Sequence, residues 1–275
     1  MNKLLKKLAV FLFLFSTAAF ILFWTLPLPG DISILMYHFV GTELDAKMEK
    51  NYVSEKSLER QMSFLKRFGY HVISMQDYEA IRKGQQKPRG REVVLTFDDG
   101  HHTFDSKALP ILKNYSFPVM LFLISDWLKG EPAATGSMTE ETVKRIHSQY
   151  SWISIGAHTK SHRMLSELTD AEVEEEIIGS KKDLEAMFGV PIRYLAYPFG
   201  NYDDRSIEAV KKAGYQFAFT TSPKKLRLGV AGPGDFQLNR IKISRNADNP
   251  VILWCKLSGF YQFFKLQSHR LLNKT

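Results

Sequence analysis

The chain has 275 residues, 44% of them hydrophobic and 24% charged, with a formal net charge of +8. This length and composition exclude a disordered or low-complexity protein and permit one large folded domain. The single cysteine, Cys255, excludes an intrachain disulfide. The positive charge favours anionic surroundings such as a cell envelope. No basic run with interleaved aromatic residues indicates a nucleic-acid partner.

The first element expected in chain order is a transmembrane helix. The segment Leu8–Leu26 carries no charge, and as a helix it would be about 28 Å long, enough to cross the hydrocarbon core of a bilayer. Lys3, Lys6 and Lys7 precede it. These lysines predict a single-pass bacterial membrane protein with its body on the periplasmic or extracellular side. The alternative is a secreted protein whose signal peptide is cleaved near Ser16–Ala19.

After a linker that ends near residue 30, short apolar runs alternate with amphipathic stretches, which is typical of an α/β domain. Strands are predicted at Ser33–Phe39, His71–Ser74, Glu92–Thr96, Val119–Ile124, Trp152–Gly156, Tyr194–Tyr197, Gln216–Thr220 and Leu238–Ile243. Eight strands with helices between them favour a (β/α) barrel over an open sheet. We expect this domain to occupy residues 31–248 and the chain to be monomeric.

Two of the intervening helices have clear signals. The stretch SEKSLERQMSFLKRFGY has Leu58, Met62, Leu65 and Phe68 on one face and a stop at Gly69. The stretch TDAEVEEEIIGSKKDLEAMFG begins at a Thr169 cap and ends at Gly189.

The last segment, residues 249–275, mixes aromatic with basic side chains. It contains Trp254, Phe260, Tyr261, Phe263 and Phe264 together with Lys256, Lys265 and Arg270. Two interpretations are open: a final helix packed on the barrel, or a basic aromatic helix lying on the membrane that holds the anchor.

Polar groups follow the third predicted strand. The stretch VVLTFDDGHH runs from an apolar strand into Asp98 and Asp99. Adjacent side chains at a strand end diverge, so the two carboxylates can face different partners. Alone, an Asp-Asp-Gly sequence is most often a turn. His101 and His102 next to it have no evident role and are read as groove-lining or surface residues.

A second cluster follows the fifth predicted strand, in WISIGAHTKSH. If the chain turns helical there, His158 and His162 are four residues apart and lie on one side. Two imidazoles and a carboxylate are a common ligand set for catalytic zinc. Thr159 stands where a zincin would carry its glutamate, so a general base must come from elsewhere. The alternative is an ordinary helix start without metal.

Two further stretches contain polar groups at strand ends. In RYLAYPFGNYDD, Pro198 and Gly200 bracket Phe199 in a tight turn, where a backbone N–H can face a developing oxyanion. In ILMYHFV, His38 ends an apolar strand. It is either a hydrogen-bonded core histidine or a catalytic one. Active sites of α/β folds collect at the carboxyl ends of strands, so the stretches around Asp98, His158 and Phe199 together favour catalysis.

The sequences TFDDG (Thr96–Gly100) and HTKSH (His158–His162) resemble the first two motifs of the polysaccharide deacetylases, the NodB-homology group or carbohydrate esterase family four. The resemblance covers about Ile32–Arg245. It implies a deformed (β/α) barrel, a divalent metal, commonly zinc, and removal of acetyl groups from an N-acetylated sugar.

The resemblance implies a role for each matched residue. Asp98 would be the general base, and Asp99, His158 and His162 would be the metal ligands. The YPFG turn would match the third motif, with the Phe199 N–H as oxyanion donor. Tyr37, Tyr197, Pro198 and Arg240 are expected to line the substrate groove.

The chain departs from the family pattern in two places. The arginine that usually orients the catalytic aspartate is replaced by Ala196, so Arg193 or Arg240 would have to substitute for it. No leucine-x-histidine motif occurs near the C-terminus, and His269 is a poor substitute as general acid. ILMYHFV looks like that missing strand moved to the front, as in the circularly permuted poly-β-1,6-N-acetylglucosamine deacetylases. The resemblance therefore implies His38 as the general acid.

The expected substrate is an acetylated cell-envelope or biofilm polysaccharide. Deacetylation of a lipid-linked amino sugar is one alternative, suggested by the anchor and the aromatic tail. A second is a glycan-binding protein on the same barrel, inactive because the arginine is missing. A third is a phosphatase that binds magnesium through Asp98 and Asp99, but this would leave both histidines without a role.

Overall fold

The computed structural model describes residues 10–17, 32–41, 51–130, 136–221 and 234–258. Its strands are β1 (Ser33–Tyr37), β2 (Phe39–Val40), β3 (Tyr52–Val53), β4 (His71–Val72), β5 (Glu92–Phe97), β6 (Val119–Leu123), β7 (Ile153–Ala157), β8 (Tyr194–Ala196), β9 (Phe217–Thr220), β10 (Leu238–Asn239) and β11 (Ile241–Lys242). All eight predicted strands are present.

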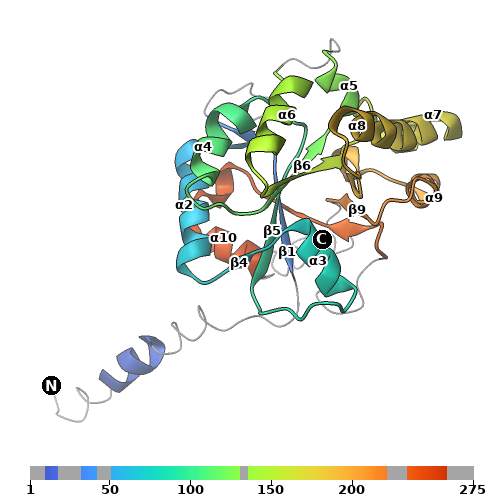
Figure 1. The fold of residues 1–275 in the computed structure, drawn as a ribbon. Coiled ribbons are helices and arrows are strands. Elements are labelled where there is room, and N and C mark those ends of the chain that lie inside the picture. The colour runs from blue at the N-terminus through green and yellow to red at the C-terminus, as the bar shows by residue number, and fades with distance from the viewer. Residues whose placement is uncertain (1–9, 18–31, 42–50, 131–135, 222–233, 259–275) are drawn as a thin grey trace, which may run out of the picture.

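Apart from the helix at residues 10–17, the helices of the described residues surround this sheet (Figure 1). The α-helices with assigned bounds are α2 (Glu55–Arg67), α3 (Met75–Arg82), α4 (Leu109–Leu112), α5 (Ser125–Leu128), α6 (Glu140–Gln149), α7 (Asp170–Glu174), α8 (Ser180–Phe188), α9 (Asp204–Lys212) and α10 (Pro250–Leu257). Two π-helical segments, η2 (Phe104–Ala108) and η4 (Glu175–Gly179), and three 3₁₀ turns, η3 (Leu165–Glu167), η5 (Pro198–Gly200) and η7 (Arg245–Asp248), complete the set.

The sheet is a nearly closed barrel of parallel strands. Its order is β10-β9-β8-β7-β6-β5-β1-β11, and β4 pairs with the start of β5. One short segment closes it: β10 pairs with β9, β11 pairs with β1, and Arg240 alone separates β10 from β11. The predicted last strand is therefore split between two neighbours. The expected barrel is confirmed, with its closure made by residues 238–242.

Both faces of the strands are buried, as parallel strands covered by helices require. The barrel interior holds one apolar cluster, to which β6 contributes Met120 and Phe122. The alternate β6 residues, among them Leu121 and Leu123, join the larger cluster under the outer helices. Helix α3 covers one end of the interior with Met75 and Tyr78 (Figure 1).

The two helices with clear sequence signals form, with one difference. Helix α2 follows Ser54, whose side chain accepts from the Ser57 N–H, and it buries Leu58, Met62 and Leu65. Phe68 is partly buried. The second helix begins after the Thr169 cap and ends at Gly189, whose φ of 67° is left-handed. Between α7 and α8 the chain is π-helical in η4, which the 3.6-residue periodicity does not predict.

Helix α10 packs on the barrel beside α2, as Figure 1 shows. Leu253 and Trp254 are buried, and Ser33 donates a hydrogen bond to the carbonyl of Leu257. Residues 250–257 thus pack on the barrel, with Trp254 in its outer core. Lys256 is buried too, and its Nζ donates a hydrogen bond to the carbonyl of Lys242 at 2.6 Å. The remaining residues named for this tail lie outside the described residues, as does His269: Phe260, Tyr261, Phe263, Phe264, Lys265 and Arg270.

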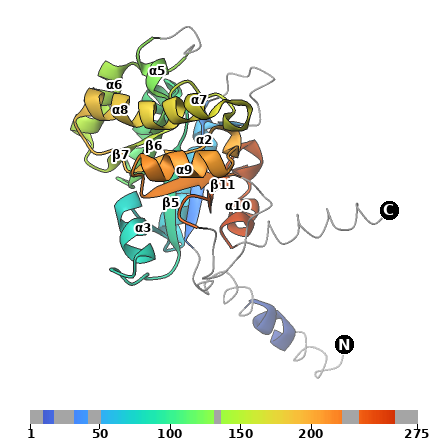
Figure 2. The ribbon, with the colours of Figure 1, turned by 90° about the vertical axis from the view of Figure 1, so that its right-hand side faces the viewer.

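Most of the predicted membrane anchor also lies outside the described residues. Of Leu8–Leu26, only residues 10–17 are described, as a helix with exposed side chains (Figure 2). Within the described part of the chain, no helix is long and apolar enough to cross a membrane.

Candidate active site

The predicted catalytic residues meet at the carboxyl ends of the barrel strands. Asp98 and Asp99 directly follow β5, His158 follows β7, and the Pro198–Gly200 turn follows β8. His38 follows β1, whose last residue accepts a hydrogen bond from the Asp98 backbone (N to Tyr37 O, 2.9 Å). The expectation that separate strands deliver these side chains to one end of the barrel is confirmed.

Asp98 points into the barrel and is held by Arg240. The Nη1 and Nη2 atoms of Arg240 each lie 2.7 Å from a different carboxylate oxygen of Asp98. Nη1 is also 3.1 Å from Thr96 Oγ1, and the guanidinium lies 5.2 Å from the centre of the Phe122 ring. Both charged side chains are almost fully buried. This two-pronged contact fixes the orientation of the carboxylate.

Arg240 therefore orients Asp98, a role for which the sequence offered both Arg193 and Arg240. Arg193 lies elsewhere, because its Nη2 contacts Glu79 Oε1 at 2.6 Å on helix α3. Ala196 is a small, buried residue on β8. Arg240 comes instead from the closing segment between β10 and β11, and β9 separates β10 from β8 in the sheet.

Arg240 also sets the charge state of Asp98. Burial alone would raise the pKa of this carboxyl, but the Arg240 guanidinium, with smaller contributions from His158 and His38, holds the pKa below its ordinary value. Asp98 is therefore ionised at neutral pH, as a proton acceptor must be.

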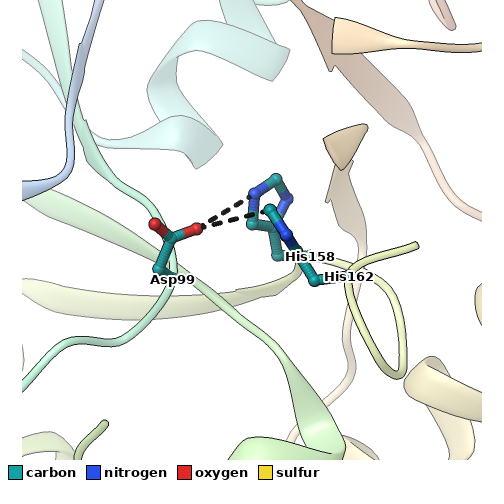
Figure 3. Close-up of side chains that lie close together, drawn as sticks. All are labelled: Asp99, His158 and His162. Atoms are coloured by element: carbon teal, nitrogen blue, oxygen red, sulfur yellow. Dashed lines mark ion pairs between the residues drawn. The ribbon is translucent and has the colours of Figure 1, made fainter. Parts of the chain in front are cut away.

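Asp99 faces the two histidines (Figure 3). Its Oδ1 lies 3.4 Å from His158 Nε2 and 3.6 Å from His162 Nε2. The three ligand atoms all lie within 4.8 Å of one another. Asp99 Oδ1 is buried and has no hydrogen-bond partner among the described residues. A buried, unpartnered carboxylate oxygen between two imidazole nitrogens fits a divalent cation, and the donor set is one that zinc uses.

The charge states of these three side chains suit metal binding. Burial would raise the pKa of Asp99, but His158 together with His38 and His162 lowers it far below the ordinary range. Burial, reinforced by His158, lowers the pKa of His162 to about 4. Burial opposes protonation of His158, yet Asp99 and Asp98 raise its pKa. Asp99 is thus anionic and His162 neutral at pH 7, while the raised pKa of His158 means that a cation competes with protons for its nitrogen.

The tautomer of His158 is set by a backbone contact. Its Nδ1 lies 2.7 Å from the carbonyl oxygen of Ala196. Because a carbonyl oxygen only accepts, Nδ1 carries the proton of the neutral imidazole, which leaves Nε2 as the nitrogen that can bind a cation. Ala196, which stands where an arginine was expected, thus orients the candidate ligand His158 through its backbone carbonyl.

The histidine loop is not helical, which corrects one step of the sequence argument. Thr159 and His162 have left-handed φ values of 63° and 65°, and no helix spans residues 158–162. The two imidazoles still meet, with ring centres 4.9 Å apart, because the loop doubles back. Asp99 (φ 69°) and Phe199 (φ 57°) are left-handed as well. Such unfavourable backbone conformations gather at functional sites.

Phe199 forms one wall beside His162. Its ring centre lies 4.6 Å from that of His162, and its side chain is 63% exposed. Trp127 lies in helix α5, and its ring centre is 5.6 Å from that of His162. Gly200 ends the turn, and a Cβ there would lie 2.4 Å from Thr221 Oγ1. The turn thus requires glycine at this position. The role of the Phe199 N–H as oxyanion donor stays a prediction.

For Tyr37 and Tyr197, the prediction that they line the substrate groove is wrong. Tyr37 is fully buried under the outer helices, and its hydroxyl donates to Gln61 Oε1 at 3.0 Å. Tyr197 is also buried, and its hydroxyl donates to the carbonyl of Phe236. Both tyrosines occupy outward strand positions, where helices cover them. Pro198 and Arg240 are buried as well. Trp127, which the sequence analysis did not single out, lies beside the histidines instead.

His101 and His102 make local contacts near β2. Their Nδ1 atoms lie 2.9 Å from Thr103 Oγ1 and 2.8 Å from the carbonyl of Gly136, respectively. Neither joins the cluster of Asp99, His158 and His162.

His38 lies beside the two carboxylates without a fixed partner. Its Nδ1 is buried and has no hydrogen-bond partner within the described ranges. Burial lowers its pKa, whereas Asp99 and Asp98 act in the opposite direction. The alternative interpretation, a core histidine held by a hydrogen bond, is therefore not supported at Nδ1. The role of His38 as general acid stays a prediction.

Substitution of His38 by Gln is expected to lower turnover about 10²- to 10⁴-fold, the usual contribution of a general acid. Zinc content should not change, because His38 is not among the clustered ligands. The comparison requires the turnover number and the metal content of the same preparation. Full activity in the His38→Gln variant would remove this residue from the mechanism.

Substitution of Arg240 by Met is expected to shift the acid limb of the pH–activity profile to higher pH. Burial that raises the pKa of Asp98 remains, while the guanidinium that lowers it is lost. The carboxylate then takes up a proton at a higher pH, so activity is lost earlier as the pH falls. Breaking this buried pair should also lower the free energy of unfolding by about 3–5 kcal/mol.

Arg193→Met is the matched control for Arg240→Met, since it removes a partly exposed arginine that is paired with Glu79 on α3. Its stability cost should be about 0–1 kcal/mol, with the pH profile unchanged. An unshifted acid limb in Arg240→Met, or an equal shift in both variants, would contradict the assigned role of Arg240.

Sequence comparison places the chain among known proteins. The profile described as polysaccharide deacetylase matches residues 85–218. YxkH of Bacillus subtilis strain 168, a protein assigned to the polysaccharide deacetylases, is 30% identical over 218 residues, which span 78% of this chain and 72% of YxkH. The poly-β-1,6-N-acetyl-D-glucosamine N-deacetylase of Staphylococcus aureus strain MRSA252 is 26% identical over 235 residues, spanning 82% of this chain and 79% of that protein.

Two solved structures share the fold. IcaB from Ammonifex degensii superposes with a TM-score of 0.70 at 25% identity, over 82% of this chain and 98% of IcaB. The Streptococcus pyogenes deacetylase PplD, solved in complex with acetate, gives a TM-score of 0.69 at 26% identity, over 79% of this chain and 94% of PplD. The profile match includes Asp98, Asp99, His158 and His162, whereas His38 and Arg240 lie on either side of it.

Proposed function

Because the chain belongs to the polysaccharide deacetylase family, we propose that it is a metal-dependent hydrolase that removes N-acetyl groups from an amino-sugar polymer of the cell envelope or of a biofilm. One observation carries the proposal: an unpartnered Asp99 oxygen faces two imidazoles, beside a second aspartate held by a buried arginine. A single cluster thus contains a ligand set and an ionised proton acceptor.

Asp99, His158 and His162 would hold the cation. In this ligand set it is most commonly zinc, and it would supply Lewis-acid chemistry that acidifies a water molecule and polarises the acetyl carbonyl. The contact of His158 with the Ala196 carbonyl keeps one ligand nitrogen correctly oriented.

The remaining residues handle protons and charge. Asp98, ionised and fixed by Arg240, accepts the proton of the attacking water. The Phe199 N–H, in a turn that requires Gly200, faces the oxyanion that develops as the carbonyl carbon becomes tetrahedral. His38 donates a proton to the sugar nitrogen as the C–N bond breaks. The products are acetate and a free amine, and without this proton an amide anion would have to leave.

The polymer is favoured as substrate by the relatives and by the walls of the site. The Staphylococcus aureus relative is named for action on poly-β-1,6-N-acetyl-D-glucosamine. Exposed Phe199 and partly exposed Trp127 flank His162, and flat aromatic faces suit the apolar face of a sugar ring. A lipid-linked amino sugar remains the second candidate.

An acetate-release assay tests the proposal. Zinc-loaded protein is incubated, with and without chelator, with β-1,6-linked N-acetylglucosamine oligomers, chitin oligomers, peptidoglycan and lipid-linked amino sugars. Chelator-sensitive release from a soluble oligomer supports the polymer. Release from the lipid-linked sugar alone transfers the assignment to that substrate, and binding of glycan without any release contradicts the enzyme.

Two rival functions lose support from the site. The inactive glycan-binding protein was suggested by the missing arginine, but Arg240 makes the contact with Asp98 that such an arginine would make. The magnesium phosphatase left both histidines without a role, yet His158 and His162 lie next to Asp99. We therefore rank both below the deacetylase.

We further propose that the catalytic domain acts outside the cytoplasm. The proposal rests on the sequence: Lys3, Lys6 and Lys7 precede the uncharged segment Leu8–Leu26. Protease added to intact cells should degrade the domain if it is anchored and exposed. A cytoplasmic, protease-protected domain would contradict this location.

A further inference from the structure

Glu176 is a carboxylate on the buried face of a helix. It lies in η4, the π-helical segment between α7 and α8. Val173 and Ile177 share its buried face, and Glu176 itself is 5% exposed. A carboxylate in such surroundings is unfavourable unless hydrogen bonds satisfy its oxygens. Packing of the helix alone therefore does not explain a glutamate here.

The histidine loop satisfies this carboxylate. The backbone N–H groups of Lys160 and Ser161 donate to Glu176 Oε2 at 3.0 and 2.9 Å. The Ser161 hydroxyl donates to Oε1. All three donors belong to the loop between the candidate ligands His158 and His162, although Glu176 is at least fourteen positions from either histidine in the sequence.

The same loop is held from its other side by α5. The backbone N–H groups of Ser125 and Asp126 donate to the carbonyls of Thr159 and Lys160, at 3.3 and 3.0 Å. Glu176 thus accepts hydrogen bonds from the loop N–H groups, and α5 donates hydrogen bonds to the loop carbonyls. The loop is clamped between two elements that contain no candidate metal ligand.

The clamp matters because the loop adopts an unfavourable backbone. Thr159 and His162 have left-handed φ values, which non-glycine residues keep only when their surroundings enforce them. The left-handed turn brings His162 Nε2 to 3.6 Å from Asp99 Oδ1. Without the Glu176 hydrogen bonds the loop is free to relax, and the His162 imidazole moves away from the other two ligands.

We infer that Glu176 is a positioning residue for the metal site, which it builds by fixing the loop that carries His162. The inference rests on the proposed function, because it assumes that Asp99, His158 and His162 hold a cation. It assigns a role to the π-helical segment η4, a type of helix irregularity that is frequent near functional sites.

The test is the dissociation constant for Zn²⁺, measured by competition with a chromophoric chelator. Loss of an outer partner of a metal ligand weakens binding about 10- to 100-fold, and we expect this for Glu176→Ala. Glu176→Gln should stay within about threefold of wild type, because its amide can still accept from both backbone N–H groups and donate to the Ser161 hydroxyl.

Two control variants separate positioning from other effects. Val173→Ala leaves a cavity on the same helix face and lowers stability, yet it retains the loop contacts, so zinc affinity should not change. Glu175→Gln removes the neighbouring charge, which pairs with Lys160 at the surface, and should also leave zinc affinity unchanged.

The outcomes are distinct. Wild-type zinc affinity in Glu176→Ala overturns the inference, and so does equal loss in Glu176→Gln or Val173→Ala. A wild-type protein that binds no zinc instead contradicts the proposed function. If Glu176→Ala does not fold, Ser161→Ala removes one of the three hydrogen bonds from the loop side, and it should weaken zinc binding by a smaller factor.

Discussion

Replacement of Asp98 by Asn is expected to reduce acetate release by about 10²- to 10⁴-fold, the range that general-base catalysis contributes. Asn has almost the same shape but does not accept the proton of the attacking water. Asp98 is not one of the three clustered ligands, so zinc content should be retained. The measurement is the turnover number on the preferred oligomer, with zinc per chain determined on the same sample.

Stability must be followed in the same variant. Asn leaves the buried guanidinium of Arg240 without a charged partner, which should cost about 3–5 kcal/mol of unfolding free energy. Asp105→Asn is the control, since Asp105 makes a surface ion pair with Arg145 and should retain both activity and stability. Near wild-type turnover in a folded Asp98→Asn variant would exclude Asp98 as the base.

Replacement of Asp99 by Ala is expected to abolish metal binding and, with it, activity. The change removes the only anion among the three ligands and leaves His158 and His162 without the oxygen that both approach. Loss of a residue that only hydrogen-bonds a metal ligand weakens binding about 10- to 100-fold. Loss of the ligand Asp99 itself should weaken zinc binding more than that. Zinc per chain after gel filtration reports the effect.

The Asp99→Ala variant should also lower the pKa of His158. Asp99 and Asp98 now raise that pKa against the effect of burial, so loss of one carboxylate favours the neutral imidazole. Histidine proton resonances titrated with pH in the metal-free protein would record the shift. A zinc-replete, active Asp99→Ala protein would contradict the ligand assignment.

The barrel could be predicted from the sequence because its strands are buried on both faces. Continuous apolar runs such as that of β6 identify a parallel strand without any knowledge of its neighbours. The closure was less predictable. A single run from Leu238 to Ile243 divides at Arg240 because its two halves pair with different strands, and no local periodicity records which strands lie next to it.

The site was predictable where its residues share short motifs. Asp98 and Asp99 are adjacent, and His158 and His162 belong to one loop, so their diverging or converging directions follow from local geometry. The backbone that joins the two histidines was not predictable as a left-handed turn, because the hydrogen bonds that enforce it come from Glu176 and α5.

Contacts between distant segments explain the remaining differences. Arg240 and Asp98 are 142 positions apart, so the sequence left Arg193 as an equal candidate. Tyr37 and Tyr197 lie near the ends of predicted strands and beside catalytic residues, yet both side chains point outward and join the core under the helices. Side chains alternate between the two faces of a strand, and this alternation decides which residues face the substrate. At a strand end the turn interrupts the alternation, so the sequence does not show which face a residue takes.

The most direct test of the account is acetate release from β-1,6-linked N-acetylglucosamine oligomers by one protein sample in three states. A metal-dependent deacetylase should release acetate when loaded with zinc, stop after chelation, and recover when Zn²⁺ is added back. Asp99→Ala protein carried through the same cycle should remain inactive throughout. Release that chelation does not affect, or that Asp99→Ala retains, would contradict a metal-dependent deacetylase built on Asp99, His158 and His162.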